Sequence, residues 1–334
     1  MSAQEPIEFD PGVVGDLDDA SVRGDSSSLR ESTTSITSSI YEYRTIHGRS
    51  YQSSKTTEYW APTDNRHLEG NDVAHQYTLM LMNNNLFAAP LKDPKKILDV
   101  GTGTGIWAID IADQFPDAEV IGTDISAVQP SWVPSNCAFQ IDDAQLDWTF
   151  KKDHFDFIHI RNLFGGIDDW PKLYKQAFAH LKPGGWIESM EIDIQTRSEN
   201  PRVQNDPNHV FHKWCQLFWA AGEKTGRSFK IARDGQMQKY ISEAGFVDVH
   251  HQWWKVPIGG WAQNPLLKQV GQYNGLYIDL SLDGFAVFPV GQILGWTLEE
   301  VQELVNSMRK EFADPKSLPY YNLHLVYARK PESA

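Results

Sequence analysis

The chain has 334 residues, of which 41% are hydrophobic and 12 are tryptophan, enough for one large α/β domain or two small ones. Its formal net charge of −14 excludes the basic surface that a DNA- or RNA-binding protein presents to phosphates. Two cysteines, Cys137 and Cys215, exclude a disulfide framework and zinc spacing, and no apolar run reaches the length of a membrane span, so we expect a cytoplasmic protein with no membrane partner.

The first forty residues are predicted to be a disordered tail. Up to Glu31 they include eight acidic residues against two arginines, and serine and threonine dominate residues 26–39. This composition cannot bury enough apolar surface to offset the entropy of ordering. A cap segment follows over residues 41–95, where apolar side chains at helical spacing predict a helix between residues 68 and 86.

Strands and helices then alternate, which predicts a parallel, doubly wound α/β sheet. We expect helices after the first and fourth strands, and a turn at Lys182-Pro183-Gly184-Gly185 before the fifth. The five predicted strands are the short apolar runs at 96–100, 119–123, 138–141, 155–160 and 186–190.

The pattern changes after the fifth strand. Helices are predicted at residues 210–221 and 233–244, and strands at 246–256 and 322–328. We expect these two strands to form an antiparallel hairpin that extends the sheet, so that the core covers residues 96–256 and 320–331. Residues 257–319 between them are predicted to be an inserted substrate lid with one clear helix, which the capping box of Thr297 and Glu300 begins.

A glycine loop, Asp99-Val100-Gly101-Thr102-Gly103-Thr104-Gly105, joins the first strand to its helix, and Asp124 ends the second strand. Glycines allow a ligand to approach the backbone, and an acid at Asp124 suits the hydroxyls of a ribose. The loop does not match the NAD-binding motif Gly-x-Gly-x-x-Gly, because Ile106 occupies the position of the third glycine. It is also not a phosphate-binding loop, since no Gly-Lys-Ser/Thr follows. The acid before the first glycine suits a cationic amine, so the motif resembles motif I of the class I methyltransferases, which bind S-adenosylmethionine. A tight turn without a ligand is the alternative.

Further cofactor contacts are expected where the parallel strands end, because open α/β sheets bind ligands along that edge. An acid after the third strand can meet the adenine amino group, and Arg161 after the fourth can hold a carboxylate. The predicted cofactor-binding residues are Tyr59, Asp99, Gly101, Thr102, Gly103, Gly105, Asp124, Ile125, Asp142, Asp143, Ala144, Arg161 and Asn162.

Methyl transfer from a sulfonium requires a gripped cofactor, an acceptor in line with the methyl group and a way for the acceptor to lose a proton, but no metal. Arg161, Glu191 and His75 are the candidate catalytic residues, each with a structural role as its alternative. Trp214, Phe218 and Trp253 are candidates for binding a hydrophobic or aromatic acceptor, although a helical aromatic stripe is more often core.

Several segments together resemble the fungal LaeA-like methyltransferases. The glycine loop and the Lys-Pro-Gly-Gly turn are general to class I enzymes, whereas Gln129-Pro130-Ser131-Trp132-Val133-Pro134 with Asp142-Asp143-Ala144 is far more specific. The resemblance covers about residues 41–331. It implies a class I methyltransferase fold, with a Rossmann-like, mostly parallel sheet, an antiparallel last strand, an N-terminal helical cover and a helical lid, and it implies S-adenosylmethionine as the cofactor.

The family includes enzymes of secondary metabolism and also regulators that work in complexes with velvet-type proteins, so two functions remain open. The acidic surface, the aromatic content after the fifth strand and the long lid favour methylation of a small, hydrophobic or aromatic secondary metabolite at oxygen, nitrogen or a carboxylate. The acidic tail and the resemblance favour the alternative, a LaeA-type regulator that acts on transcription through a velvet-type partner and therefore also in the nucleus.

Overall fold

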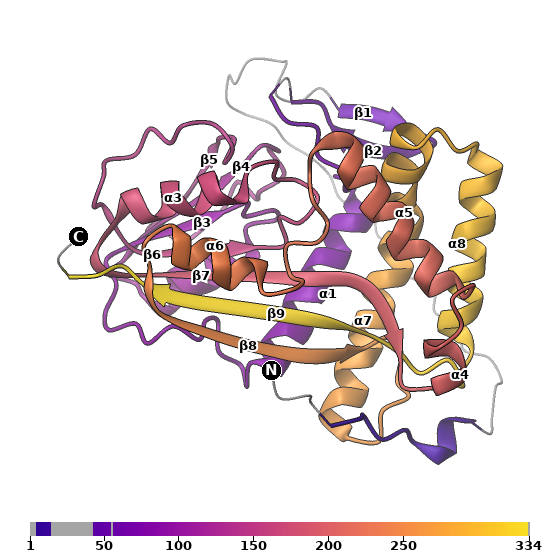
Figure 1. Ribbon diagram of the computed structural model, residues 1–334. Coiled ribbons are helices and arrows are strands. Elements are labelled where there is room, and N and C mark those ends of the chain that lie inside the picture. Colours follow the sequence, from indigo (N-terminus) through magenta and orange to yellow (C-terminus); the bar gives the residue numbers. More distant parts are fainter. Residues whose placement is uncertain (1–4, 15–42, 55, 333–334) are drawn as a thin grey trace.

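The computed structural model describes residues 5–14, 43–54 and 56–332, and its centre is a seven-stranded sheet (Figure 1). The strand order is β5-β4-β3-β6-β7-β9-β8, so chain order reverses between β3 and β6, where open α/β sheets form a ligand-binding crevice. The predicted α/β fold, a mostly parallel sheet with an antiparallel last strand, is confirmed. The parallel strands are β3 (Lys96–Val100), β4 (Glu119–Asp124), β5 (Cys137–Ile141), β6 (Phe155–Arg161) and β7 (Leu181–Ser198); β9 (Pro319–Arg329) runs antiparallel to β7 and to β8 (Val247–Pro257).

Helices cover both faces of the sheet, which explains why β3 and β6 are made almost wholly of buried residues. α3 (Trp170–His180) and α6 (Gln236–Glu243) lie on one face, and α1 (Asn65–Leu81) lies behind the other (Figure 1). α2 (Ile106–Gln114) follows the glycine loop, and its Trp107 and Ile111 are buried in one cluster with Ile97 of β3.

The cap segment is tied to both α1 and the lid. Its strands β1 (Tyr43–Ile46) and β2 (Arg49–Gln52) form a hairpin, and Asp64 caps α1 by accepting from the backbone N–H of His67. The Arg49 guanidinium lies 2.7 Å from the Asp64 carboxylate and 2.8 Å from that of Asp283. Since Asp283 belongs to the lid, this half-buried ion triad joins three segments that the sequence analysis treats separately.

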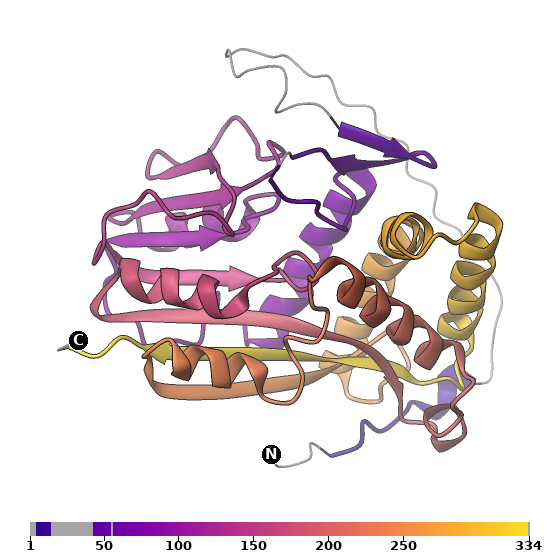
Figure 2. The same ribbon diagram turned by 45° about the horizontal axis from the view of Figure 1, so that its top comes forward.

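Residues 257–319, the segment predicted to be a lid, lie at the end of the sheet where the parallel strands finish (Figures 1 and 2). The predicted capping box is present, because Thr297 and Glu300 bond reciprocally at the start of α8. The lid also contains a second, longer helix, α7, that the sequence analysis did not predict because glycine at 271, 275 and 284 lowers helical propensity. A Cβ at Gly271 would lie 2.1 Å from the Gly259 carbonyl oxygen, so close packing requires that glycine. The helices at this end are α4 (Pro201–Gln204), α5 (Val210–Thr225), α7 (Pro265–Ala286), a π-helix (Val287–Ile293) and α8 (Leu298–Ala313).

Residues 5–14, within the segment expected to be a tail, are packed against the base of α7. Phe9 bridges Ala262, Asp10 lies 2.7 Å from Lys268, and Ile7 is buried in a cluster with Trp261. A short 3₁₀ turn, Pro11–Val14, follows, and residues 15–40 of the predicted tail lie outside the described residues.

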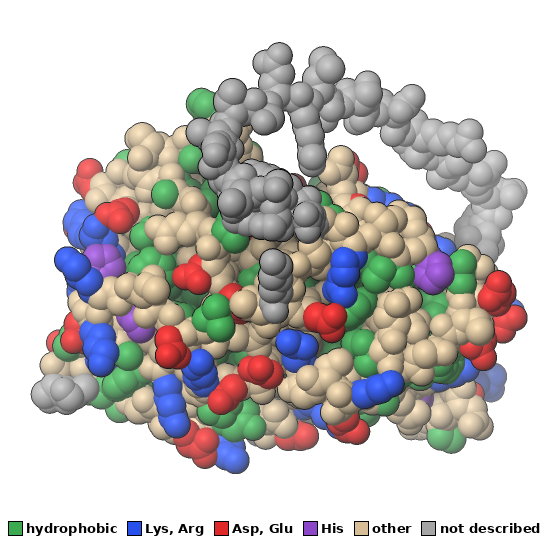
Figure 3. Space-filling view, turned by 90° about the horizontal axis from the view of Figure 1, so that it is seen from above, with side chains coloured by type: hydrophobic (Ala, Val, Ile, Leu, Met, Phe, Trp, Pro, Cys, Tyr) green, Lys and Arg blue, Asp and Glu red, His purple; other side chains and the backbone are tan. Residues whose placement is uncertain are grey.

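The surface view in Figure 3 shows basic and acidic side chains interspersed over the described part of that face. Within the ranges 5–14, 43–54 and 56–332, none of the helices is both long enough and apolar enough to cross a membrane.

Candidate active site

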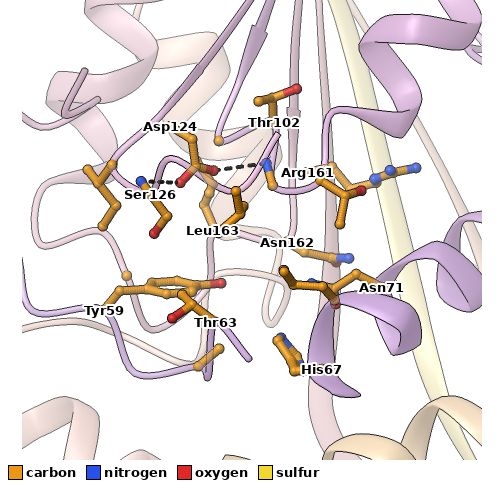
Figure 4. Close-up of a pocket in the computed structure, with 18 of the residues that line it drawn as sticks. Tyr59, Thr63, His67, Asn71, Thr102, Asp124, Ser126, Arg161, Asn162 and Leu163 are labelled. Atoms are coloured by element: carbon orange, nitrogen blue, oxygen red, sulfur yellow. Dashed lines mark hydrogen bonds between the residues drawn. The ribbon is translucent and has the colours of Figure 1, made fainter. Parts of the chain in front are cut away.

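One cavity lies at the carboxyl edge of the parallel strands, between the glycine loop, α1 and the lid (Figure 4). The empty space of this cavity, counted together with its open mouth, is about 1290 Å³. Residues 59–63 of the cap segment and two α7 side chains, Tyr277 and Phe285, line it opposite the strand ends. The predicted cofactor contacts that line it are Tyr59, Gly101, Thr102, Gly103, Asp124, Ile125, Asp142, Asp143, Ala144, Arg161 and Asn162, and His75 lines it as well.

Asp124 lines this cavity, and each of its carboxylate oxygens accepts one backbone hydrogen bond. One oxygen accepts from the Ser126 backbone N–H at 2.8 Å and the other from the Gly103 N–H at 2.8 Å (Figure 4). Burial raises the pKa of Asp124 to about 6. Gly103 has a φ of +57°, and nothing lies within 4 Å of the position of a Cβ there, so a ligand has space beside the loop backbone. An ionised carboxylate next to that space suits a diol that donates two hydrogen bonds.

Two predicted cofactor contacts, Asp99 and Gly105, do not line the cavity. The Asp99 carboxylate is buried beneath the loop, where it accepts from the Thr102 hydroxyl at 2.6 Å and lies 2.7 Å from Nδ1 of His159. Asp99 therefore stabilises the loop instead of facing a cofactor amine. A Cβ at Gly105 would lie 2.3 Å from the ring of Phe139, so packing against that ring explains this glycine.

The two acidic residues after β5, Asp142 and Asp143, differ in burial. Asp143 is buried and accepts from the Thr57 hydroxyl at 2.6 Å and from the Gln145 backbone N–H at 3.0 Å. Asp142 is less buried and accepts only from the backbone N–H of Asp143 among the described residues, through one oxygen. Its second oxygen can therefore accept from an amino group, whereas Asp143 ties the cap segment to this loop. Thr57 was not among the predicted site residues, because its contact with Asp143 spans 86 positions and no local pattern marks it.

Arg161 has no ion pair with a carboxylate in the part of the chain that the structure describes, although it borders the cavity. Its one hydrogen bond there runs from Nη1 to Nδ1 of His75, at 3.2 Å. Because a guanidinium only donates, Nδ1 of His75 is the acceptor and its Nε2 carries the proton toward Asp110, 2.8 Å away. Burial also lowers the pKa of His75. The lone pair of this neutral histidine is thus occupied, so the structure makes His75 a support for Arg161 and unsuited to the predicted catalytic role of a base.

Two polar side chains that line the cavity have no side-chain hydrogen bond within the described residues. Asn162 has a φ of +56°, and its buried side-chain oxygen has no hydrogen-bond partner among the described residues. The Tyr59 ring crosses the cavity (Figure 4), and burial raises the pKa of its hydroxyl. Since buried polar atoms nearly always find partners, the Asn162 oxygen indicates that a ligand completes the site.

Glu191, a predicted catalytic residue, does not line the cavity. Its fully buried carboxylate accepts from the backbone N–H groups of Leu163 at 3.0 Å and Phe164 at 2.9 Å, and burial raises its pKa to about 8. Both oxygens are therefore committed to the loop after β6. The geometry gives Glu191 a role in holding that loop, because a general base must reach the acceptor.

The three aromatic residues predicted to bind the acceptor do not lie together in the structure. Trp214 and Phe218 of α5 line a smaller second cavity that shares the walls Trp60, Phe164, Tyr277 and Phe285 with the first. Trp253 of β8 stacks on His324 of β9, with ring centroids 6.2 Å apart, and lines neither cavity. Tyr277 and Phe285 were missed because they lie on the unpredicted helix α7.

Comparisons with known proteins identify the family of this chain. A family model described as a methyltransferase domain matches residues 73–251, more than half of the chain. The methyltransferase pytC of Aspergillus terreus is 36% identical over 319 residues, 95% of each chain. The secondary metabolism regulator LAE1 of Cochliobolus heterostrophus is 34% identical over 85% of this chain and 94% of its own. The protein-methionine methyltransferase laeA of Emericella nidulans is 31% identical over 87% of this chain and 77% of its own.

Proposed function

Because this chain belongs to the fungal LaeA-like methyltransferases, we propose that it transfers a methyl group from S-adenosylmethionine to a small, hydrophobic or aromatic secondary metabolite. One observation carries the proposal: a single cavity has hydrogen-bonding groups from the strand ends on one side and aromatic walls on the other. The first side suits a nucleoside with an amino-acid moiety, and the second suits an apolar acceptor.

The residues that line the polar side fit the cofactor part by part. Asp124 would accept from the ribose hydroxyls, and the free oxygen of Asp142 from the adenine amino group. Arg161, which lacks an ion pair among the described residues, would hold the methionine carboxylate, with His75 fixing the guanidinium. The cofactor supplies a methyl group on a sulfonium, so the protein itself contributes binding, orientation and exclusion of water.

The same cavity narrows the chemistry of the acceptor. His67 lines it, but Nδ1 of His67 lies 2.9 Å from the Ser281 hydroxyl, and burial lowers the pKa of this histidine to about 3. His75, the other histidine lining the cavity, is occupied by Arg161. Without a histidine base, the rate must come from holding the acceptor close to the methyl group and in line with it. We therefore favour an acceptor oxygen that ionises readily, a carboxylate or an acidic phenol.

Radiolabelled cofactor added to the purified protein with an extract of small metabolites tests this function. Label should enter compounds that partition into organic solvent, and the variant Asp124→Ala, checked for folding by its circular dichroism spectrum, should transfer little. Label found only in protein would contradict a small-molecule acceptor.

That opposite outcome would support a second candidate, a regulator that acts by methylating protein or by binding a velvet-type partner. Its specific support is the similarity to the secondary metabolism regulator LAE1 and to the protein-methionine methyltransferase laeA. The two candidates also differ in location, since a biosynthetic enzyme would work in the cytoplasm and a regulator of transcription in the nucleus as well.

A further inference from the structure

The second cavity, here called the inner chamber, lies behind the aromatic wall of the first. It lies between the end of β7, α5, α7 and α8, and its empty space, counted together with its opening, is about 510 Å³. Branched aliphatic side chains and aromatic rings make up most of its surface. Its lining beyond the shared wall includes Ile192, Trp214, Phe218, Ile278, Phe312 and Tyr321.

A partition of four aromatic residues separates the inner chamber from the main cavity: Trp60, Phe164, Tyr277 and Phe285 line both. The Trp60 indole N–H donates to the Phe164 carbonyl at 2.8 Å, which fixes that half of the partition. Phe285 has no such tether, since its neighbours are the rings of Trp60, His67 and Tyr277.

The Phe285 side of the partition adjoins an unusual helix. Phe285 lies in the last turn of α7, and a π-helix over Val287–Ile293 follows directly. π-Helical turns are rare and occur frequently at functional sites, because they interrupt the regular backbone ladder.

Tyr277 gives the partition a polar group. Its side chain is more than nine-tenths buried, yet its hydroxyl has no hydrogen-bond partner among residues 5–14, 43–54 and 56–332. The nearby hydroxyls of Tyr77 and Tyr321 are satisfied, since they lie 2.7 Å apart and Tyr321 also bonds to Asn274 at 2.9 Å. Because Tyr277 lines both cavities and its hydroxyl makes no hydrogen bond within those ranges, the hydroxyl can donate to a polar group of a ligand at this point.

We propose that the inner chamber binds the apolar body of the methyl acceptor, a chain or ring system that passes Phe285 and whose oxygen bonds to Tyr277 at the partition. This placement rests on the proposed function, because it puts the oxygen at the boundary with the cofactor cavity and the hydrocarbon away from the cofactor. The acceptor class is thus an amphipathic molecule with one polar end.

A homologous series of 4-alkylphenols, from ethyl to octyl, tests the inner chamber by calorimetry in the presence of S-adenosylhomocysteine. Each added methylene should raise the affinity about fourfold until the chamber is filled, as expected for burial of hydrocarbon. In Ile278→Phe the affinity should stop rising with chain length, because the larger ring occupies the chamber. The matched control is Leu276→Phe on the same helix, since Leu276 is 49% exposed and lines neither cavity.

The hydrogen bond from Tyr277 to the ligand is tested by comparing phenols with alkylbenzenes. Tyr277→Phe should weaken each 4-alkylphenol about fivefold and leave the corresponding alkylbenzene unchanged, because only the phenol can bond to the tyrosine hydroxyl. A purely structural role for Tyr277 would weaken both ligands equally. Chain-length dependence that survives in Ile278→Phe, or is absent from the wild type, overturns the inner chamber as a binding site. If S-adenosylhomocysteine itself fails to bind, the proposed function falls instead.

Discussion

The pH dependence of cofactor binding follows from the environment of Asp124. Its carboxylate accepts two backbone N–H groups and faces the cavity, and burial raises its pKa to about 6. Ribose hydroxyls donate to the ionised carboxylate, so binding favours the charged form and opposes protonation. The affinity for S-adenosylhomocysteine should therefore be at its maximum well above pH 6 and should decline as the pH falls through that value.

The size of the decline follows from the fraction of Asp124 that is ionised. With a pKa of about 6, nearly all molecules carry the ionised form at about pH 7.5, and roughly one in ten does at about pH 5. Because S-adenosylhomocysteine keeps its charge over most of this range, its affinity should fall about tenfold. An ordinary exposed aspartate, with a pKa near 3.9, would produce almost no change.

Calorimetric titrations at several pH values between these limits measure the step. Asp124→Asn should bind more weakly at neutral pH and show no step, because an amide does not titrate and its NH₂ group opposes one of the two N–H donors. Asp142→Asn serves as the matched control, since it removes a neighbouring acid of the cavity and leaves Asp124 in place. A wild-type affinity that is flat between the two limits, in a protein that stays folded, would refute the burial argument.

Three further predictions concern Arg161, Glu191 and the N-terminal residues. Arg161→Met should weaken S-adenosylhomocysteine about 10- to 100-fold and leave adenosine binding unchanged in calorimetry, because only the former carries a carboxylate. Glu191→Ala should lower the free energy of unfolding in urea by about 2–4 kcal/mol, since two buried N–H groups lose their acceptor, and Glu191→Gln should cost less. Deleting residues 1–40 should keep S-adenosylhomocysteine affinity within about twofold but lower the melting temperature, because Ile7 leaves its cluster, whereas deleting residues 1–86 should abolish binding.

Each of these predictions has an outcome that contradicts it. Equal losses of both ligands in Arg161→Met would show that the arginine acts on the fold and not on the carboxylate. A Glu191→Ala variant as stable as the wild type, but without methyl transfer, would restore a catalytic role to that acid. Normal cofactor binding after removal of residues 1–86 would show that the cap segment is no part of the site.

The sheet and the polar half of the site are determined by local sequence. Each parallel strand is a short apolar run bounded by turn residues, and strand ends meet at one edge whatever the loops contain. The position of Asp124 in the cavity therefore follows from its place at the end of a strand, as do those of Asp142 and Arg161. The glycine spacing excluded a dinucleotide for an equally local reason, the geometry of one turn.

Which of these polar residues face the ligand was decided by tertiary structure. Asp99 is paired with a histidine 60 positions away, and His75 with an arginine 86 positions away, so their orientations depend on contacts that no local pattern contains. The helix α7 is the clearest case. Its glycines lower helical propensity, yet Gly271 is required where the helix meets the backbone at Gly259, so packing both demands the residue and hides the helix from sequence analysis. The aromatic partition and the inner chamber exist only because that helix is there.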